Sequence, residues 1–380
     1  MTNSLGVRPV INSSATLTAL GGSLLAPPAL KAMIDGAAHF VDLHELHTRV
    51  SERLASLTRN EAAYVTSGAA AAMTLTVAAC ITDEAQAFPT DAEVVMFASQ
   101  RNDYDYSARF TGARIIEIGP SIAELEAALV RRPACVLWFA NTRYALGALP
   151  IEEVVRVARE VAGTPGLHAG TSGPHVGTPG PDVGAPGRDA GTGGSAAVPV
   201  IVDAAAQVPP VSSLWHYTTE VGADAVIFSG GKGLRGPQSS GLVLGKRWIV
   251  DRCRAHASPY QDIGRGMKVG KEELLGLLAA VEWTLEQDED KVLAGYEQIV
   301  DRWIAGLQGL PGVVAKRGYP SEAGQPHGRA VVGLSTNSGW TRDGLVQALW
   351  DGDPRISVGV IGVEANEIAL NPQTIEPGRT

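Results

Sequence analysis

The chain has 380 residues and a formal net charge of -9, and its acidic and basic residues are interspersed. Without a basic stripe, nucleic acid and anionic membrane surfaces are poor partners for it. No segment has the apolar length of a bilayer span and the first residues lack a signal-peptide pattern, so we expect a cytoplasmic protein with no membrane partner. The three cysteines have no CxxC spacing, which predicts reduced, buried thiols.

An N-terminal arm is expected over residues 1–30, followed by a large domain over residues 31–285. Within residues 40–57, apolar side chains recur at steps of three and four residues, which predicts an amphipathic helix. A short strand and an Ala-rich helix are expected on either side of Ser67.

Six continuous apolar runs of strand length then alternate with helical patterns. Runs of this kind are typical of strands buried on both faces, so they predict an α/β fold with a mostly parallel sheet. The runs cover residues 93–98, 113–118, 135–140, 198–203, 224–229 and 241–245.

Residues 163–194 stand apart, because Gly, Pro, Thr and Ala dominate them. Such a segment buries too little apolar surface to offset its ordering entropy, so we predict a flexible insertion. The spacing of its His168 and His175 does not fit a metal site.

The C-terminal part, residues 286–380, reads as a smaller α+β domain with short strands and a helix. A helical pattern over residues 271–310, either long or broken, leads into it.

Three motifs fall at the ends of predicted strands, where open α/β sheets place their ligands. Ser67, Gly68 and Ala69 precede a helix whose first N–H groups suit a phosphate. Asp203 ends a buried strand, where a carboxylate wants a cationic or protonated partner. Lys232 follows another strand on a glycine-rich loop that permits unusual backbone angles and close approach of a ligand, which makes it a candidate Schiff-base former.

Together, the phosphate-binding motif at the helix start, the carboxylate and the lysine match the requirements of pyridoxal 5'-phosphate. That cofactor requires a phosphate anchor, a carboxylate that keeps its pyridine nitrogen protonated, and a lysine for its aldehyde. Each motif is weak alone, and their order in the chain carries the prediction.

The motifs "EAAYVTSGAAAAMTL", "IVDAAAQVPP", "ADAVIFSGGKGLRGPQSSGLVLG" and "IGRGMKVGKEELLGLLAAVEW" resemble the selenocysteine synthase-like branch of fold-type-I pyridoxal phosphate enzymes. The likeness is greatest to its D-glucosaminate-6-phosphate ammonia-lyase-like members. It implies a homodimer or higher homo-oligomer with active sites at subunit interfaces. It also implies Lys232 as the Schiff-base lysine, Asp203 as the pyridinium partner and Ser67 with its neighbours as the phosphate site. Further cofactor-binding candidates are Gln207, Ser229 and Gly236 on these motifs, together with Gln100.

The chain departs from this pattern at several positions. Gln100 stands where related sequences have a histidine near the ring face, and Gly266 stands where a proline is usual. Ser13, Ser14 and Ala15 replace a glycine-containing turn. These changes flank the expected substrate space and leave the substrate open.

Cationic and aromatic side chains near these motifs are candidates for substrate binding: Arg265, Lys268, Arg101 and Tyr104. The alternative for Lys268 is that it merely flanks a helix start. His44 and His47 are three residues apart, which does not match the HExxH spacing of zinc helices, so no metal is expected.

The resulting hypothesis is a pyridoxal phosphate lyase that catalyses an elimination reaction of the ammonia-lyase type on a small, polar, hydroxylated or phosphorylated amino acid. Transferase, aldolase, racemase or aminotransferase chemistry on the same fold stays open, as does a non-catalytic relative that keeps the cofactor cradle. Transfer to an aminoacyl-tRNA is disfavoured by the acidic balance.

Overall fold

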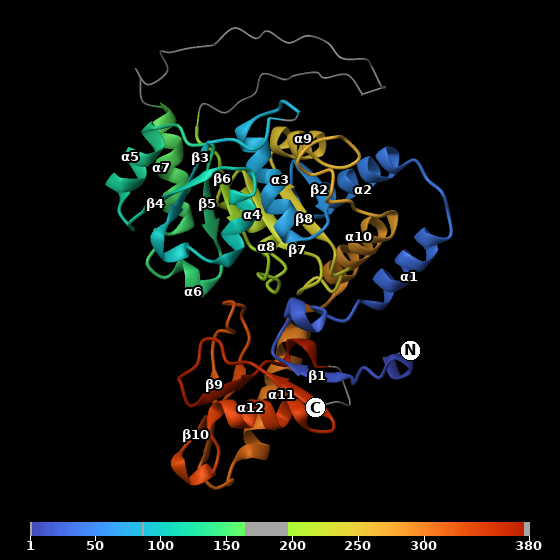
Figure 1. Ribbon diagram of the computed structural model, residues 1–380, viewed down its shortest axis with the longest axis vertical. Helices are drawn as coiled ribbons and strands as arrows, with labels where there is room; N and C mark the ends of the chain where they lie inside the picture. The colour runs from blue at the N-terminus through green and yellow to red at the C-terminus, as the bar shows by residue number, and fades with distance from the viewer. Residues whose placement is uncertain (1, 86, 164–196, 376–380) are drawn as a thin grey trace.

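The computed structural model describes residues 2–85, 87–163 and 197–375 (Figure 1). A larger part carries a seven-stranded sheet with helices around it, and a smaller part holds the C-terminal strands. The predicted insertion at residues 163–194 lies, apart from Gly163, outside the described residues, together with His168 and His175.

The large sheet has the strand order β2-β8-β7-β6-β5-β3-β4. Strand β8 is antiparallel to both of its neighbours, and the other pairings are parallel. The mostly parallel α/β sheet predicted from the apolar runs is therefore confirmed. Its strands are β2 (Ala62–Thr66), β3 (Glu93–Phe97), β4 (Arg114–Ile118), β5 (Cys135–Phe139), β6 (Val200–Asp203), β7 (Ala225–Ser229) and β8 (Gly241–Gly245).

Helices cover both faces of this sheet, because side chains of alternate strand residues enter two separate apolar clusters. Val65 and Val95 join the cluster under α2, α5, α7 and α10, whereas Tyr64 and Val94 join the cluster under α3 and α9. The helices are α2 (Leu43–Leu57), α3 (Ala69–Ile81), α5 (Ile122–Val130), α7 (Ile151–Gly163), α9 (Arg247–His256) and α10 (Lys271–Glu286), with the short α4 (Tyr106–Arg109), α6 (Thr142–Ala145) and α8 (Ser213–Trp215) between them.

The helical pattern over residues 271–310 is broken rather than continuous. Helix α10 ends at Glu286, Gln287 is extended, and α11 (Glu289–Leu307) begins behind Asp288. The Asp288 carboxylate accepts a hydrogen bond from the backbone N–H of Lys291, which is the contact that a helix N-cap makes. The break directs α11 into the smaller part of the molecule (Figure 1).

The smaller part combines both ends of the chain. Strands β9 (Val313–Gly318), β10 (Arg329–Leu334) and β12 (Glu367–Leu370) form an antiparallel sheet next to α11 and α12 (Arg342–Asp351). The N-terminal strand β1 (Val10–Ser13) pairs in parallel with β11 (Arg355–Val358). Helix α1 (Pro27–Ala37) then returns to pack against α10 of the larger part.

No helix in the described part of the chain has the length and apolar character needed to cross a membrane.

Candidate active site

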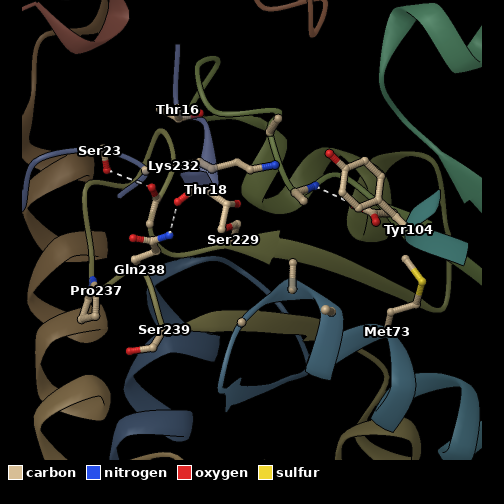
Figure 2. A pocket seen from close by; sticks show the side chains of 18 of the residues that line it. Thr16, Thr18, Ser23, Met73, Tyr104, Ser229, Lys232, Pro237, Gln238 and Ser239 are labelled. Atoms are coloured by element: carbon tan, nitrogen blue, oxygen red, sulfur yellow. Dashed lines mark hydrogen bonds between the residues drawn. The ribbon is translucent and has the colours of Figure 1, made fainter. Parts of the chain in front are cut away.

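A cavity of about 770 Å³ opens where strands β2, β5, β6 and β7 end (Figure 2). The parallel direction of these strands brings their carboxyl ends to one edge of the sheet, although the residues lie far apart in the sequence. Among the predicted site residues, those that line the cavity are Ser67, Gly68, Ala69, Tyr104, Asp203, Gln207, Ser229 and Lys232.

Lys232 and Asp203 influence each other electrostatically inside this cavity. Burial lowers the pKa of Lys232, and the negative charge of Asp203 opposes that effect. Burial raises the pKa of Asp203, whereas a 2.9 Å hydrogen bond from the Ala205 backbone N–H and the positive charge of Lys232 lower it. A lysine with a lowered pKa has more neutral, nucleophilic amine at neutral pH than an exposed lysine has. In Figure 2 the Lys232 side chain extends toward the side of the cavity where Tyr104 lies.

The glycines around Lys232 serve close packing rather than unusual backbone angles. None of Gly230, Gly231 and Gly233 has a positive φ. A Cβ on Gly231 would lie 2.4 Å from the Cα of Gln238, and a Cβ on Gly233 would lie 1.8 Å from the Val208 carbonyl oxygen. The expectation that these glycines adopt unusual backbone angles was therefore wrong: Lys232 is held by backbone segments that only glycine allows to approach so closely.

Gly68 differs from these glycines, because it has an unusual backbone angle and is not closely packed. Its φ is +115°, and a Cβ at this position would meet no atom within 4 Å. It immediately precedes α3, whose 13 residues leave their first N–H groups at the edge of the cavity. Open space beside a helix N-terminus suits a phosphate group.

The residues present therefore fit pyridoxal 5'-phosphate. A space at the start of α3 can take the phosphate, the Asp203 carboxylate at the end of β6 can face a pyridine nitrogen, and the Lys232 amine can reach an aldehyde.

The N-terminal segment forms a wall of the cavity that the sequence did not predict. Thr16, Thr18 and Ser23 line it. The Gln238 side chain donates a 2.9 Å hydrogen bond to the Thr18 carbonyl, and the Ser23 hydroxyl donates one of 3.1 Å to the Gly231 carbonyl (Figure 2). The lysine loop and the N-terminal segment thus hold each other in place.

Asn141 and Tyr144 also line the cavity and were missed. They follow β5, whose end lies beside the end of β6. The rule that selected Asp203, a polar residue at the end of a buried apolar run, would have found Asn141, which follows the run of residues 135–140.

Two of the predicted cofactor-binding residues do not line the cavity. Gln100 is fully buried and directs its amide to the backbone of Phe139, with which it makes two hydrogen bonds. Gly236 is buried against α10, where a Cβ would lie 3.2 Å from the Ala280 Cβ.

Three of the four predicted substrate-binding residues also lie elsewhere. Arg101 is paired with the carboxylates of Asp105, at 2.6 Å, and Glu117. Arg265 lies at a shallow pocket beside Phe110, and Lys268 is exposed. Tyr104 is the one that lines the cavity.

The described residues contain no group of three or more His, Cys, Asp and Glu side chains that could hold a metal ion. His44 and His47, on α2, line a second cavity instead.

Solved structures with this arrangement are pyridoxal phosphate enzymes. The structure of D-glucosaminate-6-phosphate ammonia-lyase matches with a TM-score of 0.75 and 26% identity, covering 99% of this chain and 94% of that one. Serine palmitoyltransferase of Sphingomonas wittichii matches with a TM-score of 0.56 and 13% identity, over 95% and 81% of the two chains. The chain has the fold of the fold-type-I pyridoxal phosphate enzymes.

Sequence comparison supports the same relationship. The chain is 29% identical over 392 residues to D-glucosaminate-6-phosphate ammonia lyase of Salmonella typhimurium, covering 98% of this chain and 93% of that enzyme. It is also 29% identical over 394 residues to 5'-C-glycyluridine monooxygenase-decarboxylase of a Streptomyces species, covering 98% and 87%. No protein-family model matches the chain. The predicted resemblance to D-glucosaminate-6-phosphate ammonia-lyase-like enzymes is therefore confirmed.

Proposed function

We propose that the protein is a pyridoxal phosphate-dependent lyase. It catalyses an elimination reaction on a small polar amino acid whose side chain is hydroxylated or phosphorylated. One observation carries the proposal: Lys232, with its lowered pKa, shares a cavity with Asp203 and with the start of α3. The similarity to an ammonia lyase along nearly the whole chain supports the reaction class.

Bound pyridoxal phosphate supplies an aldehyde that takes up amines and a pyridine ring that accepts electrons. Ser67, Gly68 and the first N–H groups of α3 would hold its phosphate, with Ala69 beside them. The Asp203 carboxylate would pair with the protonated pyridine nitrogen. Burial raises the pKa of Asp203, and the positive charge of the pyridinium would oppose that shift and favour the carboxylate form. Ala205, Gln207 and Ser229 border the same space.

Lys232 moves the proton in this proposal. When Lys232 is not bound to the cofactor, its Nζ would be a free amine whose pKa is lowered by burial, suited to take the α-proton of a bound substrate at neutral pH. With a β-hydroxy amino acid, water leaves and water is taken up again as ammonia departs. The net products are a 2-oxo acid and ammonia.

Arg265 and Lys268 do not reach the cavity of their own chain, and we propose that they serve the cavity of a neighbouring copy in a homodimer or larger homo-oligomer. Exposed apolar side chains on and after α1 support such an assembly, among them Ile34 and Phe40, which are 63% and 104% exposed. A Lys232→Ala variant and an Arg265→Ala variant, inactive alone, should regain activity when co-assembled if sites are shared. Failure to complement, with mixed oligomers demonstrated, would contradict shared sites.

The main test is the visible absorption spectrum of the purified protein beside that of Lys232→Ala, each before and after borohydride. We expect a cofactor band that borohydride fixes covalently in the wild type and not in the variant. Amino acids with β-hydroxyl or phosphorylated side chains are then assayed for 2-oxo acid and ammonia. A wild-type protein that binds no pyridoxal phosphate when it is supplied would overturn the proposal.

A second candidate reaction is an oxygen-dependent decarboxylation, because the Streptomyces monooxygenase-decarboxylase has the same identity to this chain as the ammonia lyase. The consumption of dioxygen and the release of carbon dioxide distinguish the two reactions. Decarboxylation with monooxygenation consumes dioxygen and releases carbon dioxide, whereas elimination does neither, so an oxygen electrode distinguishes them with the same substrates.

A further inference from the structure

A second cavity of about 680 Å³ lies between α2, strand β2 and the segment that follows α9. Thr66 lines this cavity, whereas the next residue, Ser67, lines the proposed active site. The two cavities are therefore neighbours at the end of β2 but have different walls. Nothing in the proposed reaction uses the second one.

Two buried nitrogen atoms of its lining residues have no hydrogen-bond partner: Nε2 of His47 and Nε of Arg254. Buried polar groups in folded proteins are almost always paired, so two orphans on one cavity need an explanation. Arg254 also takes part in none of the ion pairs that the structure shows among the described residues. A guanidinium that borders a cavity without a carboxylate partner is suited to bind an anion.

The His47 ring is held in a fixed orientation. It stacks on the ring of Tyr64, with centroids 4.3 Å apart and planes inclined by 24°. Burial, followed by the positive charge of Arg254, lowers the pKa of His47 to about 3, while a hydrogen bond to the Val65 backbone opposes this shift. The imidazole is therefore neutral at physiological pH.

A neutral imidazole donates from one nitrogen and accepts at the other. The unpartnered Nε2 takes one of these two roles, and a hydroxyl group can be its partner in either. A ligand that pairs with both unpartnered nitrogens needs an anionic oxygen for Arg254 and a hydroxyl group for His47.

Other polar groups on the cavity are compatible with such a ligand. His44 and Ser258 add further hydrogen-bonding groups. The negative charge of Asp42 also borders the cavity, but its Oδ1 accepts hydrogen bonds of 2.8 and 3.1 Å from the backbone N–H groups of His44 and Glu45 as the N-cap of α2.

We propose that this cavity is a second ligand site, in which Arg254 and His47 bind a small oxyanion that carries a hydroxyl group, such as a hydroxycarboxylate or a hydrogen phosphate. The proposal does not rest on the proposed function of the first cavity, although the lining residue Met267 lies between Arg265 and Lys268, which are proposed to serve a neighbouring copy. It does not require Lys232, Asp203 or a bound cofactor.

Calorimetry on the cofactor-loaded protein tests the proposal with glycolate, acetate and inorganic phosphate as probes. We expect glycolate or phosphate to bind, and acetate, which lacks the hydroxyl, to bind more weakly. Arg254→Gln should weaken binding about tenfold or more, because it removes a charge-assisted hydrogen bond. Arg252→Gln is the matched control: it removes a positive charge from the same helix, where Arg252 faces Asp83 and Trp248.

His47→Phe keeps a ring against Tyr64 but removes Nε2, so glycolate should then bind no better than acetate. A second measurement uses the wild-type protein alone. In protein with isotope-labelled histidine, the NMR signal of the His47 imidazole should shift when the probe that binds is added. Whichever of glycolate and inorganic phosphate binds more tightly indicates whether the ligand's anionic group is a carboxylate or a phosphate. Absence of binding by all three probes, binding unchanged in Arg254→Gln, or an unshifted His47 signal would each overturn the proposal.

Discussion

Gln100 and Phe139 are joined by two hydrogen bonds: the Gln100 amide donates to the Phe139 carbonyl at 3.2 Å, and the Phe139 N–H donates to the Gln100 Oε1 at 3.1 Å. Both residues are buried. Within the described residues, β3 pairs in parallel with β5 at Val94 and Val95, so the Gln100 side chain supplies a contact between the two segments beyond that ladder. Its role is to hold the end of β5, from which Asn141 and Tyr144 reach the cavity.

Gln100→His, which introduces the histidine that the family resemblance implies at this position, should therefore destabilise this protein. An imidazole carries its donor and acceptor on opposite sides of the ring and cannot serve both backbone groups of Phe139 at once. We expect a loss of about 1–3 kcal/mol in the free energy of unfolding, measured in urea, because one buried backbone group is left unpaired. Gln347→Ala, which removes an exposed amide on α12, is the control and should stay within about 0.5 kcal/mol. An unchanged stability in Gln100→His would mean that the pair with Phe139 contributes nothing.

Gly68→Ala should weaken cofactor binding as well as stability. Its φ of +115° is unfavourable for alanine, and the added methyl group would project into open space at the start of α3. We expect about 1–3 kcal/mol of backbone strain, together with a lower affinity for pyridoxal phosphate measured by titration of the apoprotein. Gly309→Ala is the matched control, because Gly309 has a φ of +86°, has equally open surroundings and does not line the cavity. If both variants bound the cofactor as the wild type does, the phosphate would not lie at Gly68.

Ala15→Gly should stabilise the chain. Ala15 is buried and has a φ of +60°, in the left-handed region that glycine occupies without strain. The departure from a glycine-containing turn, noted in the sequence, therefore leaves strain beside Thr16 on the cavity wall. Relief of that strain, less the greater flexibility of glycine in the unfolded chain, should raise stability by about 0.5–1 kcal/mol. A lower melting temperature in Ala15→Gly would show that the buried methyl group contributes more than the strain costs.

The sheet could be predicted from the sequence because its strands are buried on both faces and read as continuous apolar runs. The same logic located Asp203 and Lys232, since residues after parallel strands meet at one edge. The pairing of β1 with β11 could not be predicted, because the partners lie at opposite ends of the chain and neither run is distinctive. For the same reason the N-terminal wall of the cavity was missed. The burial of the Gln100 side chain could not be predicted either. It depends on hydrogen bonds to the backbone of Phe139, and a pattern of side chains in the sequence does not reveal backbone contacts.

The apoprotein of the double variant Lys232→Met, Asp203→Asn should be more stable than wild-type apoprotein at pH 7. Burial lowers the pKa of Lys232 and raises that of Asp203, so in both cases folding disfavours the charged form. For Asp203 the cost of folding appears as pH rises above the ordinary carboxyl pKa, and for Lys232 it appears as pH falls below the ordinary amine pKa. Both costs are therefore present near pH 7. Replacing the two groups with neutral ones of similar size should stabilise the fold by about 1–4 kcal/mol, measured by urea unfolding.

The same double variant should have no detectable turnover, because the amine and the carboxylate of the proposed mechanism are both absent. Stability and activity then move in opposite directions, as expected where a fold holds charged groups for chemistry rather than for packing. Unfolding at pH 9 separates the two contributions, because the Lys232 cost falls as the pH rises toward the ordinary amine pKa, whereas the Asp203 cost remains. The single variant Asp203→Asn should therefore account for a larger share of the gain at pH 9 than at pH 7. A double variant less stable than the wild type at both pH values would show that the two groups stabilise the apoprotein together, and that their burial has no cost to recover.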